Sequence, residues 1–319
     1  MKQIKGGVTA AKGYEAASTA AGIKYQGRTD MALIYSQVPC VSAGTFTTNV
    51  VKAAPVKWDR QIVDSGAGVQ AVVVNSGIAN ACTGEEGMGY CKETAEAAAK
   101  ALNIDVAGVL VGSTGVIGMQ LPMQKLVDGI QVLAGKKAEG LQSGHDAALA
   151  IMTTDTVEKE MAVEMEIGGK TVTIGGMSKG SGMIHPNMCT MLAFITTDAA
   201  ITKEALQKAL SEDVEDTYNM ISVDGDTSTN DTAILLANGL AGNQEITYAS
   251  PEYETFKEAL HMVNETLAKK MAGDGEGATA LFEVKVVGAE SIKQAKTLAK
   301  SVVCSNLTKA AIAGHDANW

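Results

Sequence analysis

The chain has 319 residues, a formal net charge of −10 and a sequence pI near 5.0. It shows no basic face of the kind that binds phosphates, so this balance argues against a nucleic-acid-binding protein. No apolar run reaches the roughly 18 residues of a membrane-spanning helix, and the N-terminus lacks the apolar core of a secretory signal. The five cysteines are few, odd in number and widely spaced, which is typical of reduced thiols. We therefore expect a cytoplasmic protein that does not bind membranes.

Helical and strand patterns alternate along the chain, with glycine clusters between them. In the first half we predict a strand at 69–74, a helix at 90–102, a strand at 106–111 and a helix at 120–133. A hairpin follows at 161–167 and 171–174, because Gly168-Gly169 is a favoured two-residue turn. In the second half we predict a strand at 191–197, a helix at 202–220, a strand at 232–237, a helix at 251–272 and a strand at 280–287.

This alternation predicts an α/β fold. We find no repeat of fixed period and no low-complexity linker, and the loosest predicted connection is 131–144.

One segment sets a single hydroxyl between a glycine-rich loop and an apolar strand. It reads Lys179-Gly-Ser-Gly-Met-Ile-His-Pro-Asn-Met-Cys189-Thr190-Met-Leu-Ala-Phe-Ile195. We interpret it as a self-cleavage site, because breaking the bond between Cys189 and Thr190 gives Thr190 a free α-amine. That amine has a reference pKa of about 8 and can act as general base for the hydroxyl of the same residue. The simpler alternative is that Thr190 is an ordinary β-branched strand residue and the glycines form a turn.

The same segment resembles the processing site of the ornithine acetyltransferase (glutamate N-acetyltransferase) family, which reads Lys-Gly-x-Gly-Met-x-x-Pro-x-x-Ala-Thr-Met-Leu. Here Cys189 replaces the usual Ala, and Ile78 stands where family members generally carry Asn. The resemblance extends from Gly6 to Trp319 in the order of the family. Its further blocks are 7–14, 44–49, 52–56, 75–84, 113–118, 151–156, 222–232 and 273–279.

The resemblance implies a layered αββα architecture made of two chains after cleavage, residues 1–189 and 190–319, which assemble as a heterotetramer. It implies that Thr190 moves an acetyl group from N-acetylornithine to glutamate in arginine biosynthesis, with acetyl-coenzyme A as a further donor in some members. It assigns the oxyanion hole to Thr114 and Gly115. It assigns substrate binding to Thr153, Lys179, Thr190 and Glu276. No cofactor or metal is implied.

Taken without the resemblance, several of these residues have ordinary explanations. Thr114 and Gly115 follow a predicted buried strand, where backbone and hydroxyl donors suit an oxyanion, but such strand-to-loop turns are also common. Lys179 suits a substrate carboxylate, although most lysines are solvated surface charges. Glu276 could accept hydrogen bonds from an amino group or be a simple loop carboxylate.

The polar loop 224–230 alternates oxygen-bearing side chains, as calcium loops do. A calcium-binding EF loop needs Gly at its sixth position and Glu at its twelfth, whereas this chain has Thr229 and Leu235. We therefore interpret it as a structured loop that supports the active site through its own hydrogen bonds. The four histidines are scattered without ligand spacing, so we predict no metal site.

Two alternatives to the transferase stay open at this stage. A self-processing aminopeptidase or amidase would use the same nucleophile with water as acceptor. An inactive family member is the other alternative, because the sequence ends at Trp319 where family chains continue. We expect self-cleavage to be better preserved than acetyl transfer, since its parts all precede that point.

Overall fold

A computed structural model describes residues 1–185 and 191–318 of the protein. In this part of the chain, nine strands pair in the order β1-β6-β7-β8-β9-β3-β4-β5, with β2 beside β3. The strands are β1 (Lys2–Ile4), β2 (Tyr14–Thr19), β3 (Met31–Phe46), β4 (Val69–Ile78), β5 (Val109–Val116), β6 (Lys159–Ile167), β7 (Lys170–Lys179), β8 (Leu192–Thr197) and β9 (Thr232–Ala237).

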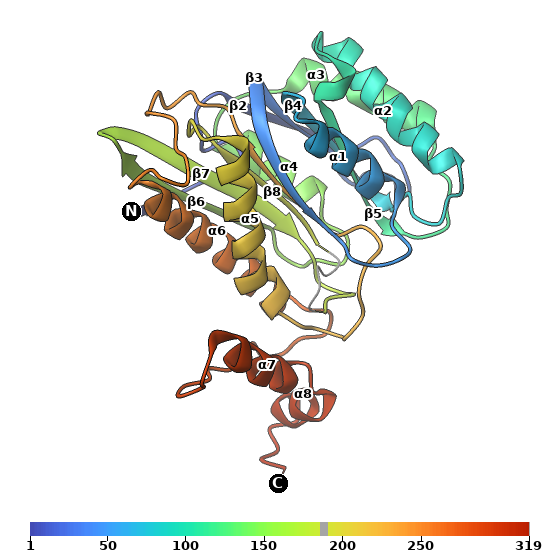
Figure 1. Ribbon diagram of the computed structural model, residues 1–319. Coiled ribbons are helices and arrows are strands. Elements are labelled where there is room, and N and C mark those ends of the chain that lie inside the picture. Colours follow the sequence, from blue (N-terminus) through green and yellow to red (C-terminus); the bar gives the residue numbers. More distant parts are fainter. Residues whose placement is uncertain (186–190, 319) are drawn as a thin grey trace.

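One long strand, β3, belongs to two sheets. Its register shifts between Tyr35 and Cys40. Residues before the shift pair with β2 and β4, whereas residues 41–46 pair with β9. The two sheets therefore join through β3 and lie face to face rather than side by side (Figure 1).

Helices cover both outer faces of this pair of sheets (Figure 1). The helices of the described residues are α1 (Ala54–Ser65), α2 (Glu86–Leu102), α3 (Met123–Lys136), α4 (Leu141–Ala150), α5 (Lys203–Asp216), α6 (Tyr253–Gly273), α7 (Ile292–Val303) and α8 (Asn306–Ala313). Helices α5 and α6 pack on the sheet that contains β8 and β9, and α2 and α3 pack on the sheet that contains β4 and β5.

The period-2 alternation of the strands explains the layers, because successive side chains of a strand point to opposite faces. In β8, Leu192 and Phe194 lie in the core between the sheets, while Ala193 and Ile195 face α5 and α6. Strand β4 shows the same division between the inner core and the core under α2 and α3. The result is a helix, sheet, sheet, helix sandwich, which confirms the layered αββα architecture.

Most predicted elements are present. The helices and strands predicted at 69–74, 90–102, 120–133, 191–197, 202–220, 232–237 and 251–272 all have counterparts in the structure. The hairpin of β6 and β7 is confirmed, with Gly168 and Gly169 both at positive φ in its turn. Thr202 caps α5 by accepting a hydrogen bond from the backbone N–H of Ala205.

Two local predictions are wrong at the level of detail. The strand predicted at 106–111 begins with a short 3₁₀ turn (Val106–Gly108), whose Asp105 side chain accepts a hydrogen bond from Ala107 N–H. The loose connection predicted at 131–144 is mostly helix, because α3 runs to Lys136 and α4 starts at Leu141.

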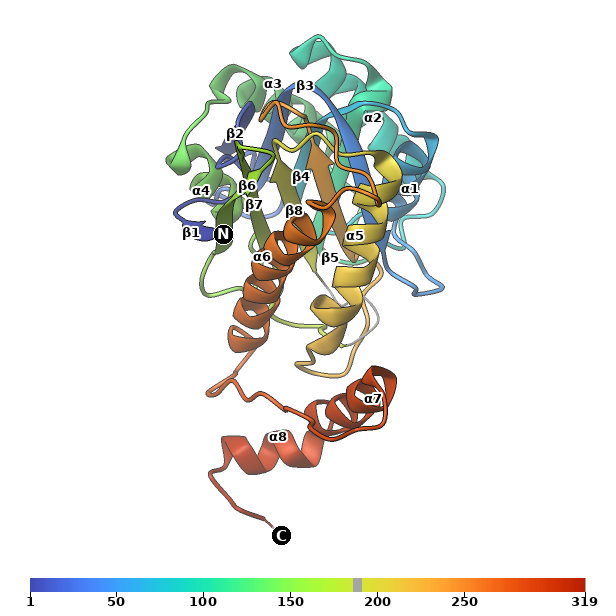
Figure 2. The same cartoon turned by 60° about the vertical axis from the view of Figure 1, so that its left-hand side comes forward.

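The strand predicted at 280–287 is also absent. Exposure alternates along this segment, with Phe282 and Val284 more protected than their neighbours, so the sequence pattern is that of a strand. A strand also requires a hydrogen-bonded neighbour, however, and no described strand pairs with this segment. It leads to α7 and α8, which lie beyond the ends of the two sheets (Figure 2).

No helix among the described residues is both long and apolar enough to span a bilayer.

Candidate active site

Five of the residues singled out from the sequence line one cavity of about 500 Å³. Because β4 and β5 run parallel, their carboxyl ends meet at the same edge of the sheet. Thr114 and Gly115 come from the end of β5, and Lys179 from the end of β7. Thr153 follows α4 and Glu276 follows α6, so segments far apart in the sequence supply the walls.

Gly115 is required by the packing of the two parallel strands. It pairs with Gly77 of β4 and has a φ of +127°, a region that residues with side chains rarely adopt. A Cβ at this position would lie 2.5 Å from the carbonyl oxygen of Gly77. The close approach places the backbone of Gly115 at the cavity wall.

Lys179 connects two of the predicted site residues directly. Its side chain is only 2% exposed, and its ammonium donates to Thr153 Oγ1 at 2.7 Å and to Thr114 Oγ1 at 3.2 Å. Because both hydroxyls accept from the lysine, each keeps its own hydrogen for donation to a bound oxygen. Burial lowers the pKa of Lys179 below its ordinary value, and the nearby Asp155 carboxylate opposes this shift.

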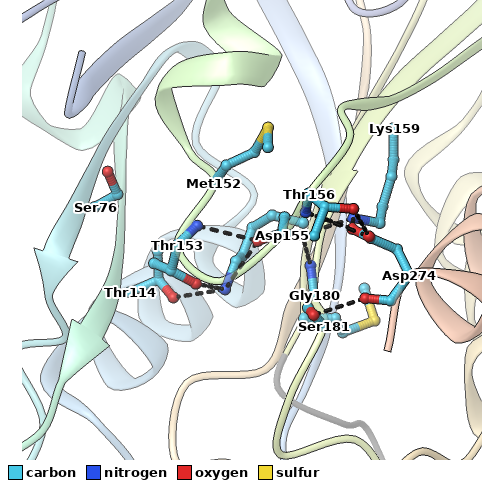
Figure 3. A network of polar contacts seen from close by, with 12 residues as sticks. Ser76, Thr114, Met152, Thr153, Asp155, Thr156, Lys159, Gly180, Ser181 and Asp274 are labelled. Atoms are coloured by element: carbon cyan, nitrogen blue, oxygen red, sulfur yellow. Dashed lines mark hydrogen bonds and ion pairs between the residues drawn. The ribbon is translucent and has the colours of Figure 1, made fainter. Parts of the chain in front are cut away.

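A buried network of ion pairs lies next to Lys179 and Thr153 (Figure 3). Lys159, which is fully buried, contacts Asp155 at 2.7 Å and Asp274 at 2.6 Å. Asp155 also accepts from Gly180 N–H at 2.7 Å and lies 3.9 Å from the Lys179 ammonium. Asp274 accepts from the backbone and side chain of Thr156. One buried lysine thus ties together the segments that carry Thr153, Lys179 and Glu276.

The carboxylates of this network are held in the ionised state. Burial opposes the ionisation of Asp155, but the ammonium groups of Lys179 and Lys159 together with hydrogen bonds lower its pKa below the ordinary value. Burial likewise opposes the ionisation of Asp274, and the contacts with Lys159 and Thr156 lower its pKa. The charges of the network are therefore mutually compensated.

Glu276 approaches the glycine-rich loop that follows β7. Its backbone N–H donates to Ser181 O at 2.9 Å. Its carboxylate lies against Gly182, where an added Cβ would be 2.5 Å from Oε1. A glycine at this position is what lets the Glu276 side chain reach the same cavity as Lys179.

Several residues of the site were not found from the sequence. Arg28 donates to Met152 O at 2.6 Å and to Thr153 O at 3.1 Å, so it holds the turn that carries Thr153. Asp155 and Lys159 were not singled out either. Asp155 lies within the block 151–156, but no local pattern distinguishes a buried ion pair from ordinary surface charges.

Cys189 and Thr190, the predicted cleavage site and nucleophile, lie outside the described residues. The residues on either side are described. Upstream, the carboxylate of Asp224 accepts from the backbone N–H groups of Met183 and Ile184. Downstream, the N–H of Met191 donates to Asp231 Oδ1 at 3.0 Å, and Met191 O accepts from Thr232 N–H at 3.1 Å.

Taken together, paired hydroxyls, a buried ammonium and a carboxylate surround a cavity at the edge of an αββα sandwich. This set can stabilise a negatively charged oxygen and bind a small ligand that carries both a carboxylate and an amino group. The sandwich also occurs in an l-aminopeptidase d-ala-esterase/amidase from Ochrobactrum anthropi, described as a variant of the Ntn hydrolase fold. That protein is 12% identical, covers 85% of this chain and 87% of its own, and has a TM-score of 0.50. The class defined by the fold is thus the Ntn-hydrolase-like αββα proteins.

Within this class, the chain belongs to the ArgJ family, whose model matches residues 15–319. It is 54% identical to the arginine biosynthesis bifunctional protein ArgJ of Symbiobacterium thermophilum over 321 residues, which is 100% of this chain and 79% of that protein. It is also similar to the ornithine acetyltransferase of Mycobacterium tuberculosis solved with ornithine. The identity to that structure is 40%, the TM-score 0.54, and the match covers 60% of this chain and 99% of that chain.

Proposed function

We propose that this protein is a self-processing glutamate N-acetyltransferase of arginine biosynthesis, which works in the cytoplasm and carries the acetyl group as an ester on Thr190. Membership of the ArgJ family supports the reaction class. The proposal depends most on one observation: Thr114, Gly115, Lys179 and Glu276 line a single cavity although they come from three separate segments.

The proposed reaction has two halves with one covalent intermediate. In the first half, Thr190 Oγ1 attacks the acetyl carbonyl of N-acetylornithine, and the α-amine of Thr190 takes the hydroxyl proton. The carbonyl oxygen becomes an oxyanion that receives hydrogen bonds from the Thr114 hydroxyl and the Gly115 N–H, each worth about 3–4 kcal/mol. The C–N bond then breaks, the proton passes to the departing nitrogen, and ornithine leaves.

In the second half, the amino group of glutamate attacks the Thr190 ester and the same oxyanion forms. Its collapse breaks the ester bond, returns a proton to Thr190 and releases N-acetylglutamate. Lys179 attracts the carboxylate of either substrate, and Glu276 accepts hydrogen bonds from a substrate amino group. Water is the competing acceptor for the acetyl-enzyme in this half of the reaction.

Cleavage would leave two chains, residues 1–189 and 190–319, that share one core. Strand β8 pairs with β7, and β9 pairs with β3, so each part supplies strands to the same sheet. This interleaving supports an assembly in which both chains stay together, and we propose that two such pairs form a heterotetramer. The M. tuberculosis chain matches 60% of this protein at nearly its full length, close to the share that residues 1–189 make of it, which supports the division.

We also propose acetyl-coenzyme A as a second acetyl donor. The relatives are called bifunctional, which supports a second donor for the same acetyl-enzyme. No cofactor is needed for either half of the reaction, since the acetyl group moves between nucleophiles without a change of oxidation state.

The decisive experiment combines an intact-mass spectrum with an acetyl-transfer assay. We expect the wild-type protein to give two masses that divide at Cys189 and Thr190, and we expect Thr190→Ala to give one uncut mass and no transfer. Thr196→Ala is a matched control, because Thr196 is a buried threonine of β8 whose hydroxyl donates to Val8 O. A Thr190→Ala protein that still transferred acetyl groups would end the proposal.

The identity of the acetyl acceptor, glutamate or water, distinguishes the transferase from the hydrolase alternative. If water were the acceptor, ornithine release from N-acetylornithine would be equally fast with and without glutamate. We expect release to accelerate with glutamate and N-acetylglutamate to accumulate in equal amount, as measured by chromatography of the products.

A further inference from the structure

The two substrates of the proposed reaction differ in charge at the end of their side chains. Both are α-amino acids with an α-carboxylate, but the side chain of ornithine ends in an ammonium group and that of glutamate ends in a carboxylate. Because the two substrates enter the same cavity in turn, the cavity has to accept either charge at this position. Glutamate therefore needs one cation more than N-acetylornithine does.

Lys179 has too few free donors to bind both carboxylates of glutamate. An ammonium group has three N–H donors. Two of them are used by the hydroxyls of Thr153 and Thr114, and the carboxylate of Asp155 lies 3.9 Å away. At most one N–H of Lys179 is thus left for a substrate, which is enough for one carboxylate and not for two.

The segment 21–30 adds two further cations, Lys24 and Arg28, to the wall of the same cavity. Asp30 also lines the cavity, but its two oxygens accept from the backbone N–H groups of Ala21 and Ile23 at 2.7 Å each. One nitrogen of Arg28 donates to two backbone carbonyls of the neighbouring wall. These bonds fix the segment at the cavity, with its one carboxylate already engaged and its two cations retained.

Lys24 lies beside the proposed oxyanion hole. A Cβ added to Gly77 would be 3.1 Å from Cβ of Lys24, and Gly77 pairs with Gly115 across the two parallel strands. The Lys24 ammonium is 4.7 Å from the centroid of the Tyr25 ring, which is half-exposed and also lines the cavity. No carboxylate among the described residues forms an ion pair with Lys24. A half-buried ammonium without a counter-charge is therefore present at the cavity wall.

We propose that Lys24 binds the side-chain carboxylate of glutamate and so selects the acceptor of the acetyl group. This inference rests on the proposed function, because it names a contact that only the second half of that reaction uses. The α-carboxylate of glutamate stays with Lys179, and the second carboxylate pairs with the ammonium of Lys24. When N-acetylornithine occupies the cavity, its side-chain ammonium pairs with Glu276 instead, and Lys24 keeps its contact with Tyr25.

Steady-state kinetics test the two halves of the reaction separately, because in a ping-pong mechanism kcat/KM for each substrate depends only on its own half. Lys24→Met keeps the length of the side chain and removes its charge. We expect kcat/KM for glutamate to fall about tenfold, the effect of losing one charge-assisted hydrogen bond. We expect kcat/KM for N-acetylornithine to stay at the wild-type value. Lys24→Arg, which keeps the positive charge, should retain most of the kcat/KM for glutamate.

Glutamine as acceptor tests the same contact from the side of the substrate, since it has the shape of glutamate without the side-chain charge. We expect the wild-type protein to prefer glutamate to glutamine by about tenfold or more in kcat/KM. Lys24→Met should lose most of this preference. Chromatography of the acetylated products measures both acceptors, and Lys24→Gln serves if the Met variant misfolds.

Lys208→Met is the matched control. Lys208 also lies over a half-exposed tyrosine ring, that of Tyr248, at 5.0 Å from the centroid. It is not among the residues that line the cavity. The control variant has the same change in net charge and loses the same kind of cation–π contact. We therefore expect it to leave kcat/KM for both substrates unchanged.

The outcomes distinguish this inference from the proposed function. A wild-type protein that transfers no acetyl group to glutamate contradicts both. Equal use of glutamate and glutamine by wild type, or an unchanged kcat/KM for glutamate in Lys24→Met, overturns the inference alone. An equal loss for both substrates in Lys24→Met, or as large a loss in Lys24→Arg, also overturns it. A loss confined to glutamate in Lys24→Met, with a reduced preference over glutamine and no change in Lys208→Met, supports it.

Discussion

At the scale of single residues, the cavity depends on positions where a side chain is excluded. Gly115 is the clearest of these, because its positive φ and the adjacent Gly77 backbone each exclude a Cβ. Gly182 is a second case, since the carboxylate of Glu276 occupies the space that a side chain would need. Glycine at both positions therefore serves the approach of functional groups rather than a turn alone.

The first residue-scale prediction concerns Gly115→Ala. The substitution adds overlap with Gly77 to the cost of a positive φ, which alone is of order 1–3 kcal/mol. We expect a lower melting temperature and a loss of acetyl transfer of about 100-fold or more, because the oxyanion donor moves. Both are measured on the purified protein, by thermal unfolding and by product chromatography.

Gly118→Ala is the control for this prediction. Gly118 also has a positive φ, +82°, but nothing lies within 4 Å of a Cβ added there. We expect Gly118→Ala to lose only the stability that a positive φ costs a residue with a side chain, of order 1–3 kcal/mol. Its rate of acetyl transfer should stay at the wild-type value. Equal losses in both alanine variants would contradict the role assigned to the Gly115 backbone.

At the scale of elements, the site depends on how three segments are fastened to one another. Lys159 at the start of β6 binds Asp155 after α4 and Asp274 after α6. Each aspartate is close in sequence to a proposed substrate residue, Thr153 or Glu276. The ends of two helices and one strand are thus fixed by a single buried ammonium group.

We predict that Lys159→Met destabilises the protein by about 3–5 kcal/mol, because it leaves two buried carboxylates without compensation. We also expect a higher KM for glutamate, since Lys179 and Glu276 lose their fixed spacing. Thermal unfolding and steady-state kinetics measure the two effects. Adding Asp155→Asn and Asp274→Asn to Lys159→Met should restore part of the stability.

Lys269→Met provides the comparison for this element. Lys269 also bridges two carboxylates, Glu265 and Glu283, but on the surface, at 3.0 Å each. Exposed pairs contribute about 0–1 kcal/mol, so we expect almost no change. A Lys159→Met protein as stable as Lys269→Met would show that the buried network does not hold the site together.

At the scale of the whole molecule, buried carboxyl groups make stability depend on pH. Burial raises the pKa of Asp59, as it does that of Asp231. A carboxyl group whose pKa is raised by folding binds its proton more tightly in the folded state. Its contribution to stability is complete below the ordinary carboxyl pKa of about 4 and is lost as the pH rises through the raised value.

The Asp59→Asn variant tests the direction in which the stability changes with pH. Because asparagine at position 59 cannot ionise, the variant does not lose folding stability through this position as the pH rises, whereas the wild-type protein does. We expect the melting temperature of the variant, relative to wild type, to become more favourable from pH 4 to pH 9. Melting curves across this range measure the difference, and a constant difference at all pH values would contradict a raised pKa at Asp59.

The sequence by itself determined the order of elements and the family. The continuous apolar runs of β4, β8 and β9 were legible as strands because these strands are buried on both faces, and the block around Thr190 carried the resemblance. Thr114, Lys179 and Glu276 could also be named in advance, but only through that resemblance. Their local patterns are equally compatible with turns and surface charges.

Tertiary structure decided the rest, because the deciding contacts join residues that are distant in sequence. Lys159 and Asp274 are 115 positions apart, and Met191 and Asp231 are 40 apart, so no local pattern reveals either pair. The segment 280–287 shows the opposite case, in which a strand-like pattern yields no strand because no strand of the described residues pairs with it. Apolar periodicity is a property of a segment, whereas charge compensation and strand pairing are properties of two segments brought together.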